Sequence, residues 1–299
     1  MTIDAVRTPE ARFADIPDFP YSPRYLDDLA GFEGLRIAVI DEGPRDAAHV
    51  YLCLHGQPSW SFLYRKMIPV FVADGGRVIA PDLLGFGRSD KPVDDSVYTF
   101  DFHRRMLMAL IARMDLQRIT LVCQDWGGIL GLTIPMEMPE RFKRLIVMNT
   151  ALTVGLSPGE GFMSWLAFSR TRPDYSVAGL FQRSVPGITA AEAAAYEAPF
   201  PDARYRAGAR VFPAIVPITP EMPGAAISKQ AARWWKTSWR GDSFMAIGLQ
   251  DPVLGEQVMM GLHRLIPNCP PPLRLEDAGH FVQERGDVVA RAALAHFNR

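Results

Sequence analysis

The sequence places a carboxylate where a tight turn would present a reactive side chain. An apolar run over residues 119–123 precedes Asp125, and the small residues Cys123 and Gly127 stand two positions on either side of it. Such a turn between a strand and a helix brings backbone against backbone and usually presents a serine. A serine attacks a carbonyl carbon, whereas a carboxylate is suited to displacing a leaving group from an sp³ carbon and forming an ester with the enzyme. The expected substrate therefore carries an electrophilic carbon, as an alkyl halide or an epoxide does.

Other polar residues favour this interpretation of Asp125 over the alternative, a helix N-cap before the Gly-Gly pair. His55, Asp251 and His280 each follow an apolar, strand-like run. Open parallel sheets build their sites just past the carboxyl ends of their strands. The order of Asp125, Asp251 and His280 along the chain also matches the nucleophile, acid and histidine order of α/β-hydrolase triads.

The elements that must position these residues follow a regular pattern through residue 150. Short apolar strands alternate with segments of helical period, which predicts an α/β fold with a mostly parallel sheet and helices on both faces. The predicted strands are 36–40, 50–54, 77–80, 119–123 and 145–148, and the predicted helices between them are 59–71, 102–114 and 128–138. Strand alternation resumes at 244–249 and 273–275, and residues 282–297 are predicted to form a closing amphipathic helix.

The segment between these two parts has a different pattern. From residue 151 to about residue 241 no strand alternation is present, and repeated prolines divide the segment into short pieces. Several short helices are expected there, inserted as a cap over the strand ends. We therefore predict an α/β-hydrolase core domain over residues 1–150 and 241–299 and a helical cap over residues 151–240.

Composition excludes several other classes of function. The formal net charge is -1 without a basic or acidic block, so nothing indicates a nucleic acid or an anionic membrane surface as partner. Residues 1–7 are too polar for a signal peptide, and no apolar run approaches the ~18 residues of a membrane span. A chain of 299 residues buries roughly three quarters of its unfolded surface, enough for one main domain. We expect a cytoplasmic monomer.

Neither metal nor cofactor is expected from the sequence. Cys53 and Cys123 lie in apolar, strand-like runs, where thiols are buried as small hydrophobic groups, and Cys269 has no partner motif. No spacing of cysteine and histidine indicates a metal site. The glycines at 85 and 87 lack the sequence context of a dinucleotide-binding loop.

Taken together, these motifs resemble the haloalkane dehalogenases of the α/β-hydrolase superfamily over nearly the whole chain. The matching stretches are residues 7–13, 18–21, 55–65, 82–90, 124–128, 244–251 and 277–281. Epoxide hydrolases share the His-Gly-x-Pro and Asp-Trp-Gly-Gly elements and use cap tyrosines, for which Tyr175, Tyr196 and Tyr205 are available. Two alternatives therefore stay open: an epoxide hydrolase, and a binding protein that keeps the fold without the activity.

The resemblance and the chemistry together imply a role for each polar residue. Asp125 is expected to form an alkyl ester, and His280 to deprotonate the water that hydrolyses it. Asp251 would accept the other imidazole N–H of His280, because Asn149, at the other usual position of this acid, cannot carry the charge. The resemblance places the oxyanion hole at the backbone N–H groups of Gln57 and Trp126. His55 is expected to brace the loop.

A leaving halide gains most from weakly hydrated N–H donors, and the indole of Trp126, next to the nucleophile, fits this role. The second indole is expected from Trp165, because Ser184 stands where a relative carries a tryptophan. Trp234, Trp235 and Trp239 are expected to pack the cap onto the core. The expected substrate pocket is apolar, as a small haloalkane requires, with water and halide as the other ligands. Its predicted wall residues are Ile129, Phe162, Phe168, Phe212, Pro213, Val216, Val253 and Leu254.

Overall fold

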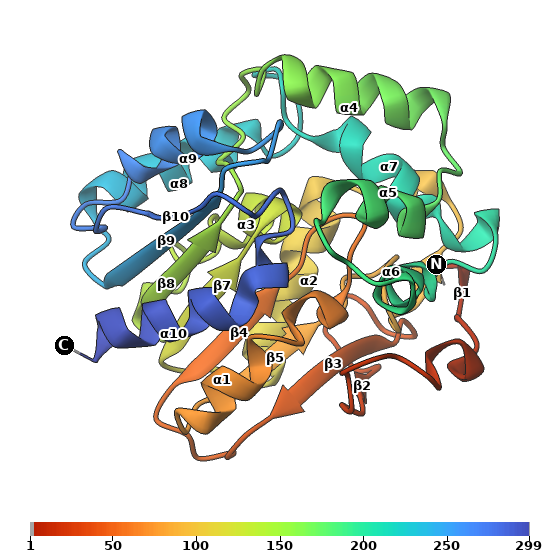
Figure 1. Cartoon of the computed structure of the whole chain (residues 1–299), viewed down its shortest axis with the longest axis horizontal. Coiled ribbons are helices and arrows are strands. Elements are labelled where there is room, and N and C mark those ends of the chain that lie inside the picture. Colours follow the sequence, from red (N-terminus) through yellow and green to blue (C-terminus); the bar gives the residue numbers. More distant parts are fainter. Residues whose placement is uncertain (1–2, 299) are drawn as a thin grey trace.

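In the computed structural model, which describes residues 3–298, an eight-stranded sheet forms the centre of the molecule (Figure 1). The strands, in spatial order, are β10 (Leu273–Leu275), β9 (Asp242–Gly248), β8 (Phe142–Met148), β7 (Ile119–Cys123), β4 (Val50–Leu54), β5 (Arg77–Pro81), β3 (Ile37–Glu42) and β2 (Arg24–Leu26). Within this sheet, β5, β4, β7, β8, β9 and β10 are parallel to one another, and β3 runs antiparallel to both of its neighbours. A separate ribbon pairs β1 (Ala5–Val6) with β6 (Lys91–Pro92).

The central strands are buried at every position because helices cover both faces of the sheet. All five residues of β4 and all five of β7 are buried. The helices α1 (Ile68–Ala73) and α10 (Gly286–Phe297) lie together on one face, and α2 (Phe100–Arg113), α3 (Asp125–Gly131) and α8 (Ala225–Thr237) lie on the other (Figure 1). The predicted α/β-hydrolase architecture is confirmed.

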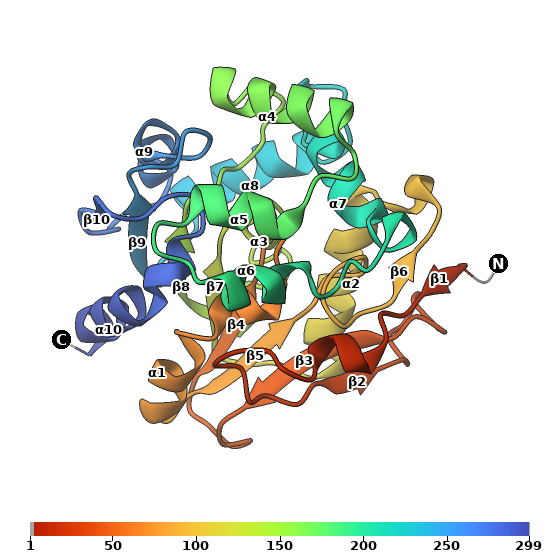
Figure 2. The same cartoon turned by 45° about the vertical axis from the view of Figure 1, so that its right-hand side comes forward.

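Four helices cross over the edge of the sheet at which the parallel strands end (Figure 2). They are α4 (Glu160–Thr171), α5 (Val177–Ser184), α6 (Ala190–Glu197) and α7 (Ala207–Val211). The next helix, α8, packs against the core instead, since Trp235 donates to the Leu132 carbonyl at 2.7 Å and Trp239 donates to Ser243 at 2.9 Å. The predicted cap segment thus ends in a helix that Trp235 fixes to the core, and Trp239, just after this helix, adds a second bond.

Two predicted helices are shorter in the structure. The segment predicted as a helix over 59–71 forms a 3₁₀ turn at Ser61–Tyr64, and α1 begins only at Ile68, with a proline in its first turn. The helix predicted over 128–138 ends at Gly131, because Pro135 cannot continue it. The sequence reading also missed α9 (Glu256–His263), which packs against β9.

Candidate active site

Asp125 lies in the sharp turn that its small neighbours predict. Its φ is 47°, a left-handed conformation that non-glycine residues rarely adopt, and its backbone N–H donates to the Asn149 carbonyl at 3.0 Å. A Cβ atom at Gly127 would collide with the Leu54 carbonyl, and one at Gly128 would collide with Thr150. Only glycine lets the start of α3 lie this close to β4 and to the end of β8. This close packing places the Asp125 side chain at the edge of the sheet.

Backbone donors and burial set the charge of the Asp125 carboxylate. The Gln57 backbone N–H donates to its Oδ2 atom at 2.8 Å, and the Trp126 backbone N–H also bonds to the carboxylate. Burial raises the pKa of Asp125, while nearby His280 and these two donors oppose the rise only in part. The structure thus places both backbone groups predicted for an oxyanion hole beside this carboxylate.

The three residues predicted as a triad lie together. Nδ1 of His280 is 2.8 Å from Oδ2 of Asp251, and Nε2 of His280 is 3.7 Å from Oδ1 of Asp125. Burial lowers the pKa of His280, but the charge and hydrogen bond of Asp251, together with the charge of Asp125, raise it to about 9. An imidazole between two carboxylates is therefore protonated at neutral pH.

Asp251 is held by donors on both of its oxygen atoms. Asn149 donates to Oδ2 at 2.9 Å, and the Val253 backbone N–H donates to Oδ1 at 2.8 Å. Burial raises the pKa of Asp251, but His280 and these donors lower it to about 2. Asn149 also bonds to both the N–H and the carbonyl of Gly248, so it fixes the end of β9 from which Asp251 follows. Asn149, which the sequence excludes as the acid of the triad, therefore holds the acid Asp251 in place.

A cavity of about 530 Å³ opens over this constellation. Its walls include Asp125, Trp126, Trp165 and His280. Seven of the eight predicted wall residues line it as well: Ile129, Phe162, Phe168, Pro213, Val216, Val253 and Leu254. Most of the wall is therefore apolar.

Phe212 is the exception, and the expectation that it lines the pocket has to be corrected. Its side chain is completely buried, and its ring centroid lies 4.7 Å from that of Trp126. Phe212 therefore supports the Trp126 ring from behind. The sequence reading also missed other wall residues. Those of the cap segment are Thr153, Pro158, Gly161, Ser164, Leu180, Arg183, Ser184 and Pro186, and those of the core are Gln250, Pro252 and Phe281.

The hydrogen bonds of the indole groups separate the tryptophans into two sets. Trp60, Trp235 and Trp239 each donate to a protein oxygen. No acceptor among residues 3–298 takes the indole N–H of Trp126 or Trp165, although both residues line the cavity. Trp234 also lacks an acceptor within this range, but it does not line the cavity. Among the described residues, two indole N–H groups without a protein acceptor therefore belong to residues on the wall of this cavity.

The tyrosines available for epoxide chemistry have other partners. Tyr196 donates to Glu284 at 2.5 Å within a buried ionic network, and Tyr175 accepts a hydrogen bond from Gln57 at 2.7 Å. Tyr205 lies in the short 3₁₀ turn before α7, and the cavity wall contains none of the three tyrosines. The site therefore lacks a pair of phenol groups placed to activate an epoxide oxygen.

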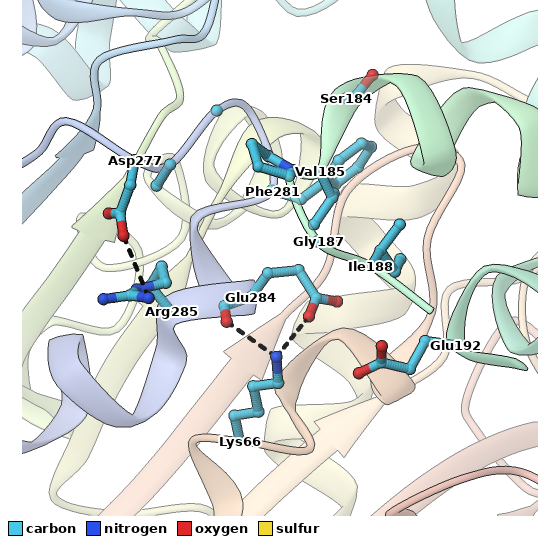
Figure 3. A pocket seen from close by; sticks show the side chains of 13 residues that line it. Lys66, Ser184, Val185, Gly187, Ile188, Glu192, Asp277, Phe281, Glu284 and Arg285 are labelled. Atoms are coloured by element: carbon cyan, nitrogen blue, oxygen red, sulfur yellow. Dashed lines mark hydrogen bonds and ion pairs between the residues drawn. The ribbon is translucent and has the colours of Figure 1, made fainter. Parts of the chain in front are cut away.

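A second cavity, of about 150 Å³, adjoins the first (Figure 3). The two share three wall residues, Ser184, Pro186 and Phe281. The charged groups in the smaller cavity are paired, since Lys66 bonds to Glu284 at 2.9 Å and Arg285 contacts Asp277 at 3.2 Å (Figure 3). Because its carboxylates are neutralised by cations, the chemistry belongs to the larger cavity. No cluster of histidine, cysteine and acidic side chains within residues 3–298 is suited to a metal ion.

Comparison with known proteins first defines the class. Residues 50–287 match the family model of the alpha/beta hydrolase fold. The chain is 44% identical to a haloalkane dehalogenase of Psychrobacter cryohalolentis, covering 96% of this chain and 95% of that protein. It is 40% identical to a haloalkane dehalogenase of Mycobacterium marinum, covering 94% and 95%.

Solved structures agree with these relatives. The haloalkane dehalogenase DpaA of Paraglaciecola agarilytica NO2 superposes with a TM-score of 0.97 at 53% identity, covering 98% of both chains. The chain belongs to the haloalkane dehalogenases, hydrolases that act on carbon–halide bonds. DpaA is described as tetrameric, which does not match the expected monomer. No helix between residues 3 and 298 is long and apolar enough to cross a lipid bilayer.

Proposed function

We propose that the enzyme hydrolyses small apolar haloalkanes through a covalent ester on Asp125. In the first step a carboxylate oxygen of Asp125 attacks the halogen-bearing carbon from the cavity, the carbon–halogen bond breaks, and the halide leaves with the bonding electrons. The observation that carries this proposal is a carboxylate in the tight turn after β7, on an apolar cavity and 3.7 Å from His280.

In the second step water attacks the carbonyl carbon of the ester, and His280 takes the proton from that water. His280 is protonated in the resting enzyme because two carboxylates raise its pKa to about 9. Alkylation converts one of those carboxylates into a neutral ester, so the pKa of His280 falls and its proton passes to solvent, which leaves the neutral imidazole that the second step requires. Asp251 remains to stabilise the imidazolium, which gives its proton to the departing alkoxide as the bond between that oxygen and the carbonyl carbon breaks, so the product leaves as the alcohol. The new carboxyl group of Asp125 then loses its proton, which restores the carboxylate and the protonated His280.

Two sets of N–H donors serve the two steps. The backbone groups of Gln57 and Trp126, which hold the carboxylate of Asp125 in the resting state, stabilise the oxyanion that forms during ester hydrolysis. The indoles of Trp126 and Trp165 bind the leaving halide, because both line the cavity without an acceptor among the described residues. This scheme requires neither a metal nor an organic cofactor.

The setting of the enzyme is also part of the proposal. Identity of 53% to a tetrameric relative over nearly the whole chain supports a tetramer here as well, which light scattering of the purified protein can test. The three cysteines Cys53, Cys123 and Cys269 are buried free thiols, which supports a reducing, cytoplasmic location.

Replacing Asp125 with alanine tests the role of the nucleophile. We expect Asp125→Ala to lower halide release from a bromoalkane by about 10⁴-fold or more, because Asp251, the other carboxylate on the cavity wall, has both oxygen atoms bonded to Asn149, His280 and the Val253 N–H. The variant should keep the far-UV circular dichroism of the wild type. Substantial residual turnover would contradict a covalent step on Asp125.

A further inference from the structure

The side chain of Gln57 ties the catalytic loop to the cap at two points. Its Nε2 atom donates to the Tyr175 hydroxyl at 2.7 Å and to the Ala209 carbonyl at 2.8 Å. Tyr175 lies between α4 and α5, Ala209 lies in α7, and Gln57 follows β4. All three residues are buried, with exposed fractions of 8% or less. These contacts join segments that are 118 and 152 positions apart.

The chemistry of the partners fixes the orientation of the Gln57 amide. A backbone carbonyl only accepts hydrogen bonds, so the group that faces Ala209 must be the amino group. That group has two hydrogens, and the Tyr175 and Ala209 oxygens take both of them. The remaining amide atom, Oε1, is an acceptor and does not stabilise an anion. The Gln57 side chain therefore lines the cavity without offering an N–H group to a halide.

The same residue supplies a backbone donor to the nucleophile. The Gln57 N–H lies 2.8 Å from Oδ2 of Asp125, so a shift of this residue would move an oxyanion donor. Gly56 leaves little freedom on the other side, because a Cβ there would collide with Asp125. The ring of Tyr175 packs edge-on against Trp165, with centroids 5.5 Å apart. One phenol thus contacts both the Gln57 loop and the indole at the cavity.

We propose that Tyr175 is a positioning residue that acts through Gln57. Its hydroxyl, with the Ala209 carbonyl, withholds the Gln57 amide from the halide and fixes the backbone N–H of Gln57 against Asp125. This inference rests on the proposed ester mechanism, and it assigns halide binding to the two indoles alone. The aligned donor matters most when charge develops on the ester oxygen, so the hydroxyl of Tyr175 serves the hydrolytic step.

The test compares single-turnover kinetics of Tyr175→Phe and the wild type with a bromoalkane. The substitution keeps the ring against Trp165 and removes only the hydroxyl. We expect hydrolysis of the alkyl-enzyme to slow by about tenfold, while the halide burst changes by less than about twofold. Tyr98→Phe is the matched control, because it removes another buried hydroxyl, which donates to the Pro92 carbonyl at 2.7 Å and lies away from the cavity. That variant should hydrolyse the ester at the wild-type rate.

Gln57→Met separates an effect through Gln57 from a general loss of packing. This variant should slow ester hydrolysis about as much as Tyr175→Phe does, and adding Tyr175→Phe to it should change nothing further. Its halide dissociation constant, measured by tryptophan fluorescence, should stay within about twofold of the wild-type value, because the amide does not bind the ion.

Three results would overturn the inference. They are an unchanged hydrolysis rate in Tyr175→Phe, an equal slowing by Tyr175→Phe in the Gln57→Met background, and a marked loss of halide affinity in Gln57→Met. If the wild type forms no alkyl-enzyme, the proposed function itself fails, and the same single-turnover experiment records that outcome separately.

Discussion

The charge on His280 predicts how the stability of the enzyme depends on pH. Asp251 and Asp125 raise the pKa of His280 to about 9, whereas an unfolded chain has the ordinary value of 6.5. A folded-state pKa above the unfolded value contributes stability that is fully present below pH 6.5 and is lost as the pH rises through 9. Between pH 7 and pH 10 this loss amounts to about 2.5 kcal/mol, because each unit of pKa difference corresponds to about 1.4 kcal/mol and the imidazole of the unfolded chain is already mostly deprotonated at pH 7.

Other groups titrate in the same range, so the prediction concerns a difference between two proteins. Burial lowers the pKa of Lys91 to about 7, which makes the folded state more stable as the pH rises and opposes the His280 effect. Lys91 is present in both the wild type and His280→Phe, so its contribution cancels between them. The stability of the wild type relative to His280→Phe should fall by about 2.5 kcal/mol from pH 7 to pH 10.

Urea denaturation at a series of pH values, followed by circular dichroism, measures this difference. The variant lacks the imidazole but keeps Asp125 and Asp251. A difference in unfolding free energy that stays flat from pH 7 to pH 10 would refute the reasoning that two carboxylates hold His280 in its protonated form. It would also remove the argument that alkylation of Asp125 lowers the pKa of His280.

Two further substitutions have direct consequences. Trp165→Phe keeps most of the ring bulk but removes one halide donor, so dehalogenation should fall by on the order of 10²-fold and the halide-induced fluorescence quench should weaken. Trp234→Phe, which removes an indole away from the cavity, should leave both unchanged; equal behaviour of the two variants would contradict the assignment. Glu284→Gln should lower the free energy of unfolding by about 3 kcal/mol, since Arg65, 1% exposed, would lose one of its two carboxylate partners. A loss below about 1 kcal/mol in urea denaturation would show that Glu192 alone suffices.

The positions of the triad residues were predictable because each follows a parallel strand. Register in a parallel sheet brings the carboxyl ends of β7, β9 and β10 to one edge, so Asp125, Asp251 and His280 had to lie near one another. The small residues around Asp125 carry a local signal as well, because only glycine fits at position 127. These features depend on short-range sequence alone.

The contents of the cap were less predictable for a physical reason. Wall residues such as Leu180 and Arg183 are set by how α5 lies on the core, and no local periodicity encodes that placement. The bond between Gln57 and Tyr175 spans 118 positions and depends on the same packing. Phe212 was expected on the cavity wall but packs behind Trp126 instead. An apolar residue near a site can support a wall residue without lining the cavity itself.

The central claim is an ester on Asp125 that His280 hydrolyses, and one experiment tests it directly. His280→Phe is mixed with excess bromoalkane, released halide is counted, and the protein is then analysed by mass spectrometry. The account predicts about one halide per active site, followed by a stall, with the alkyl group located on Asp125. Sustained turnover by the folded variant, or a halide burst without an added alkyl mass on Asp125, would contradict it.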